Sequence, residues 1–202
     1  GLPSSFDGVI YDTASISTLH ALAAAREMKV PDVRRKGLSG RAELPRVRIY
    51  CSEHAHSSVD KAVILLGHGH DAVCHVPADA DFSMRADALD AAIQRDLADG
   101  LLPIAVVATV GSTSTTSIDP VPAIADICDR YQLWLHIDAA YGGVAAAVPD
   151  RRFILDACDR AHSLVVNPHK WLFVPFDLSA LYCRRMDLLR AAFSLTPDYL
   201  VT

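Results

Sequence analysis

The sequence predicts an α/β domain with a mostly parallel central sheet and helices on both faces. Short runs rich in β-branched residues alternate along the chain with segments of helical periodicity. Clusters of polar residues directly follow the strand-like runs, as expected where parallel strands end at a ligand site. The chain has 202 residues, of which 51% are hydrophobic, so it can bury the core of one large domain.

The secondary-structure elements follow from the periodicity of the apolar residues. Strands are expected at residues 8–11, 46–51, 72–76, 103–108, 133–137 and 163–166. The clearest helix covers residues 87–99, where a leucine or isoleucine recurs at every fourth position from Leu89 to Leu97 and a glycine follows. A second helix begins near Ser15 and a third near Pro122.

The charge pattern and the composition exclude several classes of protein. The net charge of -5 comes from interspersed acids and bases, without the basic block that would neutralise nucleic-acid phosphates. No apolar run approaches the roughly 20 residues that cross a bilayer, and the N-terminal GLPSSFDGVI lacks the features of a signal peptide. The five cysteines are scattered and mostly lie in apolar runs, which favours reduced core thiols. We therefore expect a cytoplasmic protein that binds neither nucleic acid nor membrane.

Polar residues concentrate in the loops that follow the expected strands. These loops are DTAS at 12–15, SEHAHSS at 52–58, TVGSTST at 109–115, DAAYGG at 138–143 and NPHK at 167–170. Ligands of parallel sheets bind beyond the carboxyl ends of the strands. We therefore expect these loops to form one site at one edge of the sheet.

Three features of these loops suggest specific chemistry. Thr13 to Ser15 lie at a helix start, where free N–H groups and hydroxyls suit a phosphate, although an ordinary N-cap explains them equally well. Asp138 ends an apolar strand, so its carboxylate should be buried and should need a cationic or N–H partner; a helix cap is the alternative. Lys170 follows an apolar run, and partial desolvation would make its amine a nucleophile toward a carbonyl, unless the side chain merely extends to water.

A phosphate site, a buried carboxylate and a nucleophilic lysine together suit a phosphorylated aldehyde with a basic ring nitrogen. Pyridoxal 5'-phosphate is such a compound. Its aldehyde would form a Schiff base with Lys170, and its phosphate would lie at Thr13 to Ser15. Asp138 would keep the ring nitrogen protonated, so that the ring can accept electrons.

Four segments of the chain match the pattern of one known family. They are AHSS with His56, HIDAAYGG with Asp138, NPHKWL with Lys170, and FDLSALYCRR from Phe176. They resemble the group II pyridoxal-phosphate-dependent amino acid decarboxylases, and most of all the aromatic-L-amino-acid decarboxylase branch. The resemblance runs in register over essentially the whole chain. It implies the large-domain fold of fold-type I pyridoxal-phosphate enzymes. It also implies that the enzyme decarboxylates an L-amino acid, which we expect to be aromatic, to the amine and carbon dioxide.

The resemblance also implies roles for individual residues. Lys170 would be the Schiff-base lysine, Asp138 would pair with the pyridine nitrogen, and His56 would stack on the ring and contact substrate. Tyr199 falls where the family keeps the tyrosine of its mobile catalytic loop, which is suited to supply a proton to the substrate carbanion. Further cofactor contacts are expected from Thr13, Ala14, Ser15, Thr113, Ala140, Asn167 and His169.

The chain departs from the family pattern in two respects. Asp12 stands directly before the phosphate loop, where relatives usually carry a small or neutral residue, and we expect its carboxylate to point away from the phosphate. Family members also have an N-terminal segment before the equivalent of Gly1 and a small C-terminal domain after the equivalent of Thr202. Residues 1–202 are therefore expected to be the cofactor-binding large domain of a longer, homodimeric enzyme.

Alternatives remain for the function, the substrate and a metal site. Another fold-type I enzyme, such as an aminotransferase or a desulfurase, would share the phosphate loop, aspartate and lysine but not AHSS and NPHKWL together. The chain could also be an inactive cofactor-binding or assembly module. Among possible substrates, the aromatic amino acids, their hydroxylated relatives and histidine all remain open. No metal site is expected from His54, His56, His68 and His70, because His68 and His70 lie about a dozen residues from His56 and the sequence shows no carboxylate or thiol geometry that would complete a site.

Overall fold

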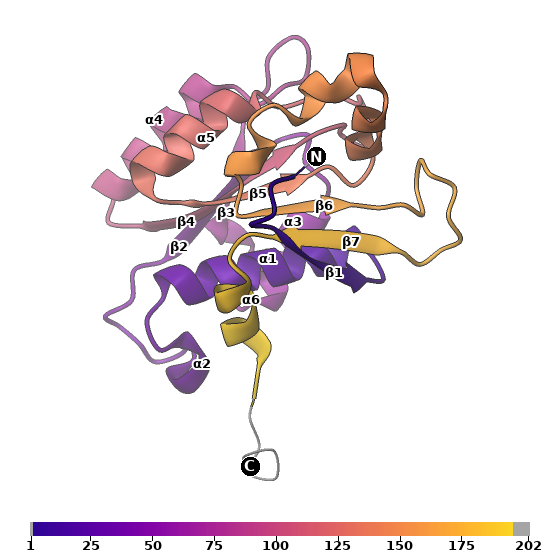
Figure 1. The fold of residues 1–202 in the computed structure, drawn as a ribbon. Helices are drawn as coiled ribbons and strands as arrows, with labels where there is room; N and C mark the ends of the chain where they lie inside the picture. The colour runs from indigo at the N-terminus through magenta and orange to yellow at the C-terminus, as the bar shows by residue number, and fades with distance from the viewer. Residues whose placement is uncertain (1, 196–202) are drawn as a thin grey trace.

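A seven-stranded sheet forms the middle layer of the molecule (Figure 1). The computed structural model describes residues 2–195. The strands are β1 (Asp7–Tyr11), β2 (Val47–Ser52), β3 (Val73–Val76), β4 (Leu102–Thr109), β5 (Trp134–Asp138), β6 (Ser163–Val166) and β7 (Ser179–Cys183). Their order across the sheet is β1-β7-β6-β5-β4-β2-β3. The strands from β6 to β3 in this order pair in parallel, and β7 runs antiparallel to both of its neighbours.

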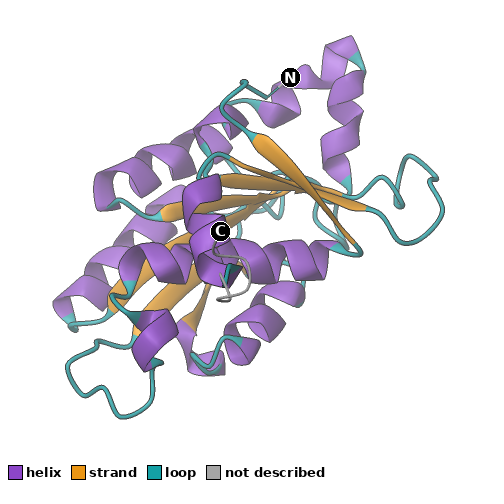
Figure 2. Ribbon diagram, turned by 60° about the horizontal axis from the view of Figure 1, so that its bottom comes forward, coloured by secondary structure: helices purple, strands orange, loops and turns teal. Residues whose placement is uncertain are grey.

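Helices cover both faces of this sheet (Figure 2). The α-helices are α1 (Ala14–Lys29), α2 (Val33–Lys36), α3 (Ser58–Leu65), α4 (Ala86–Ala98), α5 (Val121–Tyr131) and α6 (Met186–Phe193). Short 3-10 helices are η1 (His70–Ala72), η2 (Gly142–Ala147), η3 (Pro149–Leu155) and η4 (Cys158–Arg160). Helices α4 and α5 lie on one face, and α1, α3 and α6 on the other (Figure 1). The predicted fold class is therefore confirmed.

Two hydrophobic cores lie on opposite faces of the sheet. Successive side chains of a strand point to opposite faces, and in β4 Val107 joins the core that contains Leu22 of α1. Its neighbour Val106 joins the core that contains Ile124 of α5. Burial on both sides explains why the central strands read as continuous apolar runs. No helix within residues 2–195 combines the length and apolar character that crossing a membrane requires.

Strand β7 was not predicted. Ser179, Leu181 and Cys183 are buried along it, while the residues between them are only partly buried. Ser179 weakens the apolar signal of the inward-facing set, and its burial becomes understandable only in three dimensions, where its Oγ lies 3.0 Å from Ser17 Oγ of α1. The antiparallel pairing of β7 with β1 and β6 is thus an addition to the predicted sheet.

The three apolar residues whose spacing predicted helix α4 do not all lie on its buried face. Leu89 and Ile93 are buried, but Leu97 is 47% exposed. A residue eight positions along an α-helix is turned by roughly 80° from the first, whereas a residue seven positions along is turned by only about 20°. The inward position is accordingly Asp96, whose carboxylate accepts hydrogen bonds from Tyr50 Oη (2.7 Å) and Arg48 Nε (2.9 Å).

Candidate active site at the carboxyl edge of the sheet

One cavity of about 180 Å³ lies at the edge where β4, β5 and β6 end. It is lined by Thr13, Ala14, Ser15, His56, Thr109, Gly111, Thr113, Asp138, Ala140, Tyr141, Asn167, His169, Lys170 and Phe176. All the cofactor-contacting residues expected from the sequence are in this lining. Tyr199, the remaining predicted catalytic residue, lies outside the described residues.

The start of helix α1 forms one wall of the cavity. Thr13 is its N-cap residue, and the Thr13 Oγ1 accepts from the Ile16 amide at 3.5 Å. The first amides of an α-helix, here those of Ala14 and Ser15, have no partner within the helix, and the helix dipole favours an anion beside them. Thr13 is thus a cap, and the same turn also offers N–H groups to the cavity. Asp12 is exposed and is not part of the lining, as expected.

Asp138, at the end of β5, supplies a buried carboxylate. The residue is 7% exposed, and its Oδ1 accepts a hydrogen bond from the Ala140 amide at 3.1 Å. This agrees with the expectation that a buried carboxylate here needs an N–H partner. Thr109, at the end of β4, lies beside Asp138 in the parallel register. The Thr109 Oγ1 is buried and has no hydrogen-bond partner among the described residues.

Asp119 holds the end of β4 in place beside Asp138. Its carboxylate accepts from the Thr109 amide at 2.7 Å and from the Met84 amide at 2.8 Å. Burial raises the pKa of the Asp119 carboxyl, and the two amide hydrogen bonds oppose that effect. The carboxylate thereby connects the chain before α4 to the strand end that lines the cavity.

The loop between β6 and β7 contributes Lys170. The Asn167 amide donates to the Ala140 carbonyl at 3.1 Å, which joins this loop to the end of β5. The Lys170 amide donates to the Asn167 carbonyl at 3.0 Å, so a tight turn places the lysine at the cavity. Lys170 is exposed, however, and the expectation of a partly desolvated lysine is wrong for this chain by itself. The reason is geometric, because the turn projects beyond the end of the sheet and its neighbours Trp171 and Phe173 are exposed as well.

Asn167 and His169 form a pair in the wall of the cavity. The Leu178 amide donates to His169 Nδ1 at 2.8 Å, so in the neutral imidazole the proton is on Nε2. The Asn167 side-chain amide faces this Nε2 at 3.1 Å, and we orient it with its oxygen as the acceptor. In this orientation the Asn167 NH₂ group points away from His169. It is buried there and has no hydrogen-bond partner among residues 2–195. This orientation leaves an unused hydrogen-bond donor at the cavity wall.

His56 lies in the loop after β2, and its ring is held by the chain that follows. The Ser58 amide donates to His56 Nδ1 at 3.2 Å. With Nδ1 as acceptor, the neutral ring carries its proton on Nε2. The imidazole is therefore oriented before any ligand arrives, and its Nε2–H is available as a donor.

Two glycines allow the loops after β4 and β5 to touch. Gly111 has a φ of +85°, and a Cβ added there would lie 2.8 Å from Gly142 Cα. Real Cβ atoms do not approach so closely, and a positive φ strains most side chains. Only glycine therefore fits the contact that closes this part of the cavity wall.

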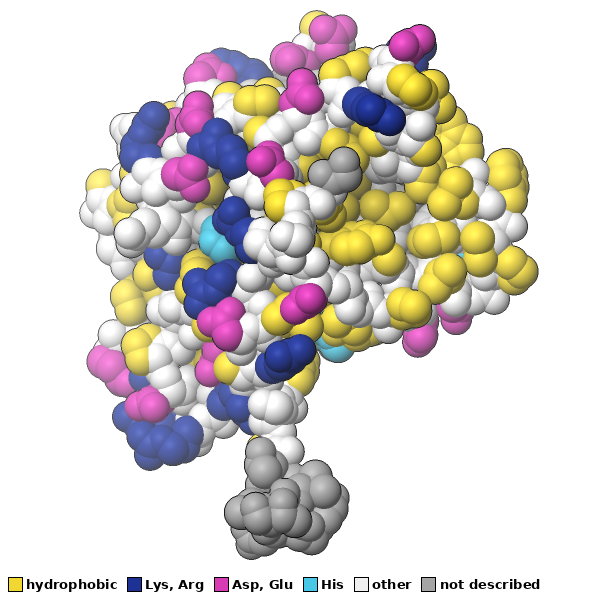
Figure 3. All heavy atoms as spheres, viewed as in Figure 1, with side chains coloured by type: hydrophobic (Ala, Val, Ile, Leu, Met, Phe, Trp, Pro, Cys, Tyr) yellow, Lys and Arg dark blue, Asp and Glu magenta, His cyan; other side chains and the backbone are white. Residues whose placement is uncertain are grey.

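An apolar surface surrounds the mouth of the cavity. Figure 3 shows apolar side chains gathered on the side of the molecule where Figure 1 places the β6–β7 loop. The exposed apolar residues in the two loops that supply Tyr141 and Lys170 to this mouth include Tyr141, Trp171, Leu172, Phe173 and Phe176. Tyr141 and Trp171 stack with their ring centroids 5.0 Å apart and their planes 6° from parallel. Exposed apolar surface of this extent is typical of an interaction site.

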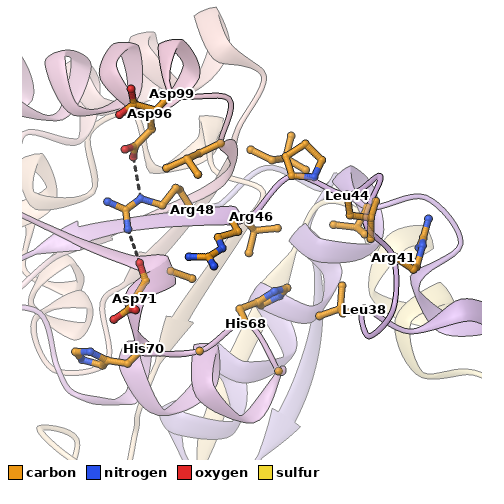
Figure 4. Close-up of a pocket in the computed structure, with 18 residues that line it drawn as sticks. Leu38, Arg41, Leu44, Arg46, Arg48, His68, His70, Asp71, Asp96 and Asp99 are labelled. Atoms are coloured by element: carbon orange, nitrogen blue, oxygen red, sulfur yellow. Dashed lines mark hydrogen bonds and ion pairs between the residues drawn. The ribbon is translucent and has the colours of Figure 1, made fainter.

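A larger cavity, of about 780 Å³, lies elsewhere on the molecule and includes residues at the amino ends of β2 and β4 (Figure 4). One ion pair joins two of the charged residues in its lining. Arg48 pairs with Asp96 and also donates to the Asp71 carbonyl, while the Tyr50 hydroxyl donates to Asp96. Parallel sheets bind ligands at the other edge, so size alone does not make this cavity the candidate active site.

Sequence reasoning did not select four residues that line the candidate active site. Thr109, Gly111, Tyr141 and Phe176 all belong to segments that it had singled out, but none carries an obvious reactive group. Thr109 could have been found as the final residue of a buried strand. Tyr141 and Phe176 contribute aromatic surface, which in a sequence is indistinguishable from core packing.

Comparison with known proteins identifies the family. The pyridoxal-dependent decarboxylase conserved domain matches residues 2–202. The aromatic-L-amino-acid decarboxylase of Sus scrofa is 44% identical over 195 residues, which cover 96% of this chain and 40% of that protein. Tryptophan decarboxylase 1 of Oryza sativa subsp. japonica is 38% identical, with 96% and 37% of the two chains covered. The chain thus spans about 40% of the length of the curated relatives it matches.

Solved structures agree with the sequence comparison. The crystal structure of Oryza sativa TDC with PLP and tryptamine superimposes with a TM-score of 0.90 at 37% identity, covering 100% of this chain and 42% of that one. That of Catharanthus roseus tryptophan decarboxylase in complex with L-tryptophan has a TM-score of 0.86 at 32% identity, covering 96% and 40%. The chain therefore belongs to the pyridoxal-dependent decarboxylase family, and its relatives place it in the aromatic-L-amino-acid decarboxylase branch of the group II enzymes.

Proposed function

We propose that this chain is the cofactor-binding large domain of an enzyme that uses pyridoxal 5'-phosphate to decarboxylate an L-amino acid. We expect the substrate to be an aromatic amino acid. The products would be the corresponding amine and carbon dioxide. The observation that carries the proposal is the convergence of a helix start, a buried carboxylate and a lysine on one cavity. When bound, the cofactor supplies a protonated pyridine ring that accepts the electron pair left behind as the carboxylate departs.

The cofactor phosphate would bind at the start of α1. The amides of Ala14 and Ser15 and the Ser15 hydroxyl offer donors there, and the helix dipole favours the negative charge. The unused Asn167 donor supports the same assignment. An unsatisfied buried donor costs about 1–3 kcal/mol, and a phosphate oxygen would supply its missing partner. His169 holds the Asn167 amide in the required orientation.

Lys170 and Asp138 would hold the two reactive ends of the ring system. Lys170 would bind the aldehyde carbon covalently through its Nζ, since the turn at Asn167 sets it at the mouth of the cavity. Asp138 would hold a proton on the pyridine nitrogen, because a buried carboxylate gains strongly from a cationic partner. Thr113 and Ala140 complete the cofactor contacts that we propose.

His56 would stack on the cofactor ring, and its Nε2–H group would donate a hydrogen bond to the substrate carboxylate. The bond from the Ser58 amide supports this assignment, because it fixes both the ring orientation and the position of the proton. For Tyr199, which lies outside the described residues, we keep the proposal that its hydroxyl returns a proton to the substrate Cα after carbon dioxide leaves. Each turnover would thus replace one carboxylate with one proton.

The exposed apolar surface supports a second subunit over the cavity mouth. Lys170 is open to solvent in this chain, and the apolar side chains around it would be covered by another copy. We therefore propose a homodimer for the longer enzyme, in which the partner helps to enclose the substrate. The Tyr141 and Trp171 stack supplies aromatic surface at this mouth, which is consistent with an aromatic substrate.

We also propose a cytoplasmic location. All five cysteines are free thiols, as expected for a protein kept in a reducing compartment. Burial raises the pKa of each, to about 12 for Cys158 and about 11 for Cys183. Four of these thiols are buried and that of Cys74 is half-buried, and with raised pKa values they would not act as nucleophiles at neutral pH.

The function is tested by measuring carbon dioxide release from a panel of amino acids with the full-length enzyme. We expect release from one or more of L-tryptophan, L-phenylalanine, L-tyrosine, their hydroxylated relatives and L-histidine, with the amine in equal amount. The Lys170→Ala variant should lose this activity, whereas Lys36→Ala, which removes an exposed lysine elsewhere, should keep it. A 2-oxo acid without carbon dioxide would indicate an aminotransferase instead. Cofactor binding without turnover of any substrate would indicate an inactive module.

A further inference from the structure

Three metal-ligating side chains meet at the outer edge of the sheet, away from the candidate active site. Asp60 lies in the first turn of α3, His70 begins η1, and His75 lies in the edge strand β3. His75 Nε2 is 2.9 Å from Asp60 Oδ1, and His70 Nε2 is 3.2 Å from the same oxygen. All three ligand atoms lie within 4.8 Å of one another. None of these residues lines the active-site cavity.

The chain between α3 and β3 brings this cluster together. Gly67 and Gly69 both have a positive φ, 81° and 80°, and they reverse the chain after α3. The turn delivers His70 beside the start of α3, and β3 then places His75 next to it. Figure 4 shows His70 at the rim of the large cavity, with its ring directed away from Arg46 and His68. Of the histidines that the sequence analysis considered for a metal site, only His70 takes part here, and the fold brings Asp60 and His75 to it.

Two of the three separations between ligand atoms suit a tetrahedral metal ion. Zinc binds imidazole nitrogen and carboxylate oxygen at about 2.0–2.2 Å, which places neighbouring ligand atoms roughly 3.3 Å apart. The two measured contacts to Asp60 Oδ1 are already close to this value. The side chain of Asp60 is 19% exposed, while those of His70 and His75 are 64% and 40% exposed. A water molecule could therefore complete the coordination.

A second contact orients His75 for this role. Its Nδ1 lies 3.7 Å from the thiol sulfur of Cys51, a buried residue of β2 that is paired in register with His75. Histidine ligands generally use one ring nitrogen for the metal and hydrogen-bond through the other. The contact with Cys51 leaves Nε2 directed at Asp60, as metal binding requires.

We propose that Asp60, His70 and His75 bind a divalent transition-metal ion, with Zn²⁺ as the preferred ion. Two imidazoles and one carboxylate suit zinc and disfavour magnesium or calcium, which select oxygen ligands. A bound ion would tie the edge strand β3 to α3 and to η1. It would replace the two contacts that His70 and His75 make with the same Asp60 oxygen.

The test is a zinc titration of the full-length enzyme, prepared without a histidine tag and treated with chelator. Zn²⁺ is added in competition with a chromophoric chelator, and Co²⁺ is used in parallel to report the geometry from its visible absorption. We expect each chain to take one Zn²⁺ from the chelator. The affinity for Zn²⁺ should be at least about tenfold weaker in each of Asp60→Asn, His70→Ala and His75→Ala. His54→Ala, which removes a histidine outside the cluster, should bind Zn²⁺ as the unchanged enzyme does. Excess Mg²⁺ should not compete.

The same variants keep the inference separate from folding and from the cofactor site. Thermal unfolding without metal should show that each variant is folded, and added Zn²⁺ should raise the Tm of the unchanged enzyme and of His54→Ala only. Failure of the unchanged enzyme to bind Zn²⁺ stoichiometrically would overturn the proposal. Zn²⁺ affinity in the three cluster variants equal to that of the unchanged enzyme would also overturn it. So would a loss of affinity in His54→Ala as large as that in the cluster variants.

Discussion

Mild acid should destabilise the protein through His136, which lies in β5 two residues before Asp138. The residue is 0% exposed, and burial lowers the pKa of its imidazole from 6.5 to about 4, against the opposing effect of the Asp138 charge. Its Nδ1 lies 2.8 Å from Ser163 Oγ, and its Nε2 has no hydrogen-bond partner among the described residues. The folded protein therefore resists protonation of this ring.

The magnitude follows from the difference in proton affinity between the folded and unfolded states. Between pH 6.5 and 4 the unfolded chain binds a proton at this histidine more readily than the folded chain does, so stability is lost as the pH falls. The contribution is fully present above pH 6.5. Going from pH 7 to pH 5, the loss attributable to His136 is about 2 kcal/mol in the free energy of unfolding.

The assay compares the unchanged protein with His136→Asn by urea unfolding at pH 7, 6 and 5. Asparagine can keep a hydrogen bond near the Nδ1 position, but it does not titrate. His68 and His162, whose pKa values are also lowered to about 4 by burial, contribute equally to both proteins and cancel in the comparison. Between pH 7 and pH 5, the free energy of unfolding of the unchanged protein should fall by about 2 kcal/mol more than that of the variant. The same pH dependence in both proteins would refute the reasoning.

Three further perturbations test the site and its assembly. Asp138→Asn should leave the cofactor bound in the full-length enzyme but reduce kcat by at least about 100-fold, because the pyridine nitrogen loses the carboxylate that keeps it protonated. Turnover near that of the unchanged enzyme would contradict this role. Gly111→Ala should lower the free energy of unfolding by about 3 kcal/mol, measured in urea, because the added Cβ meets Gly142. Gly100→Ala, which has a similar φ of +74° but open space around it, should cost only about 1 kcal/mol, and equal losses would rule out the steric explanation. Phe173 is 87% exposed and should be part of the subunit contact. Phe173→Asp should therefore shift the sedimentation of the full-length enzyme from dimer toward monomer. An active monomer in the unchanged enzyme would disprove the proposed assembly.

The parallel part of the fold was predictable because its signals are local. Each central strand is buried on both faces, so an apolar run such as residues 103–108 identifies β4 by itself. The site was predictable for a related reason. The carboxyl ends of parallel strands meet at one edge whatever their order, so Asp138 and Asn167 could be placed together without knowing which strands are neighbours.

Features that depend on tertiary contacts could not be predicted. The inward position of Ser179 in β7 is explained by Ser17, more than a hundred residues away in the sequence, and the exposure of Lys170 depends on how far its turn projects. Asp60 and His75 are separated by a helix and a turn whose path no sequence pattern gives. In each case the missing information was the position of another element.

The central claim, that Lys170 holds pyridoxal phosphate in the carboxyl-edge cavity, is tested most directly by chemical trapping. The full-length enzyme is incubated with pyridoxal 5'-phosphate, reduced with borohydride, digested and analysed by mass spectrometry. We predict one phosphopyridoxyl group per chain on the peptide that contains Lys170, and none on Lys29, Lys36 or Lys61. Stoichiometric label on another lysine, or no label at Lys170, would contradict the account.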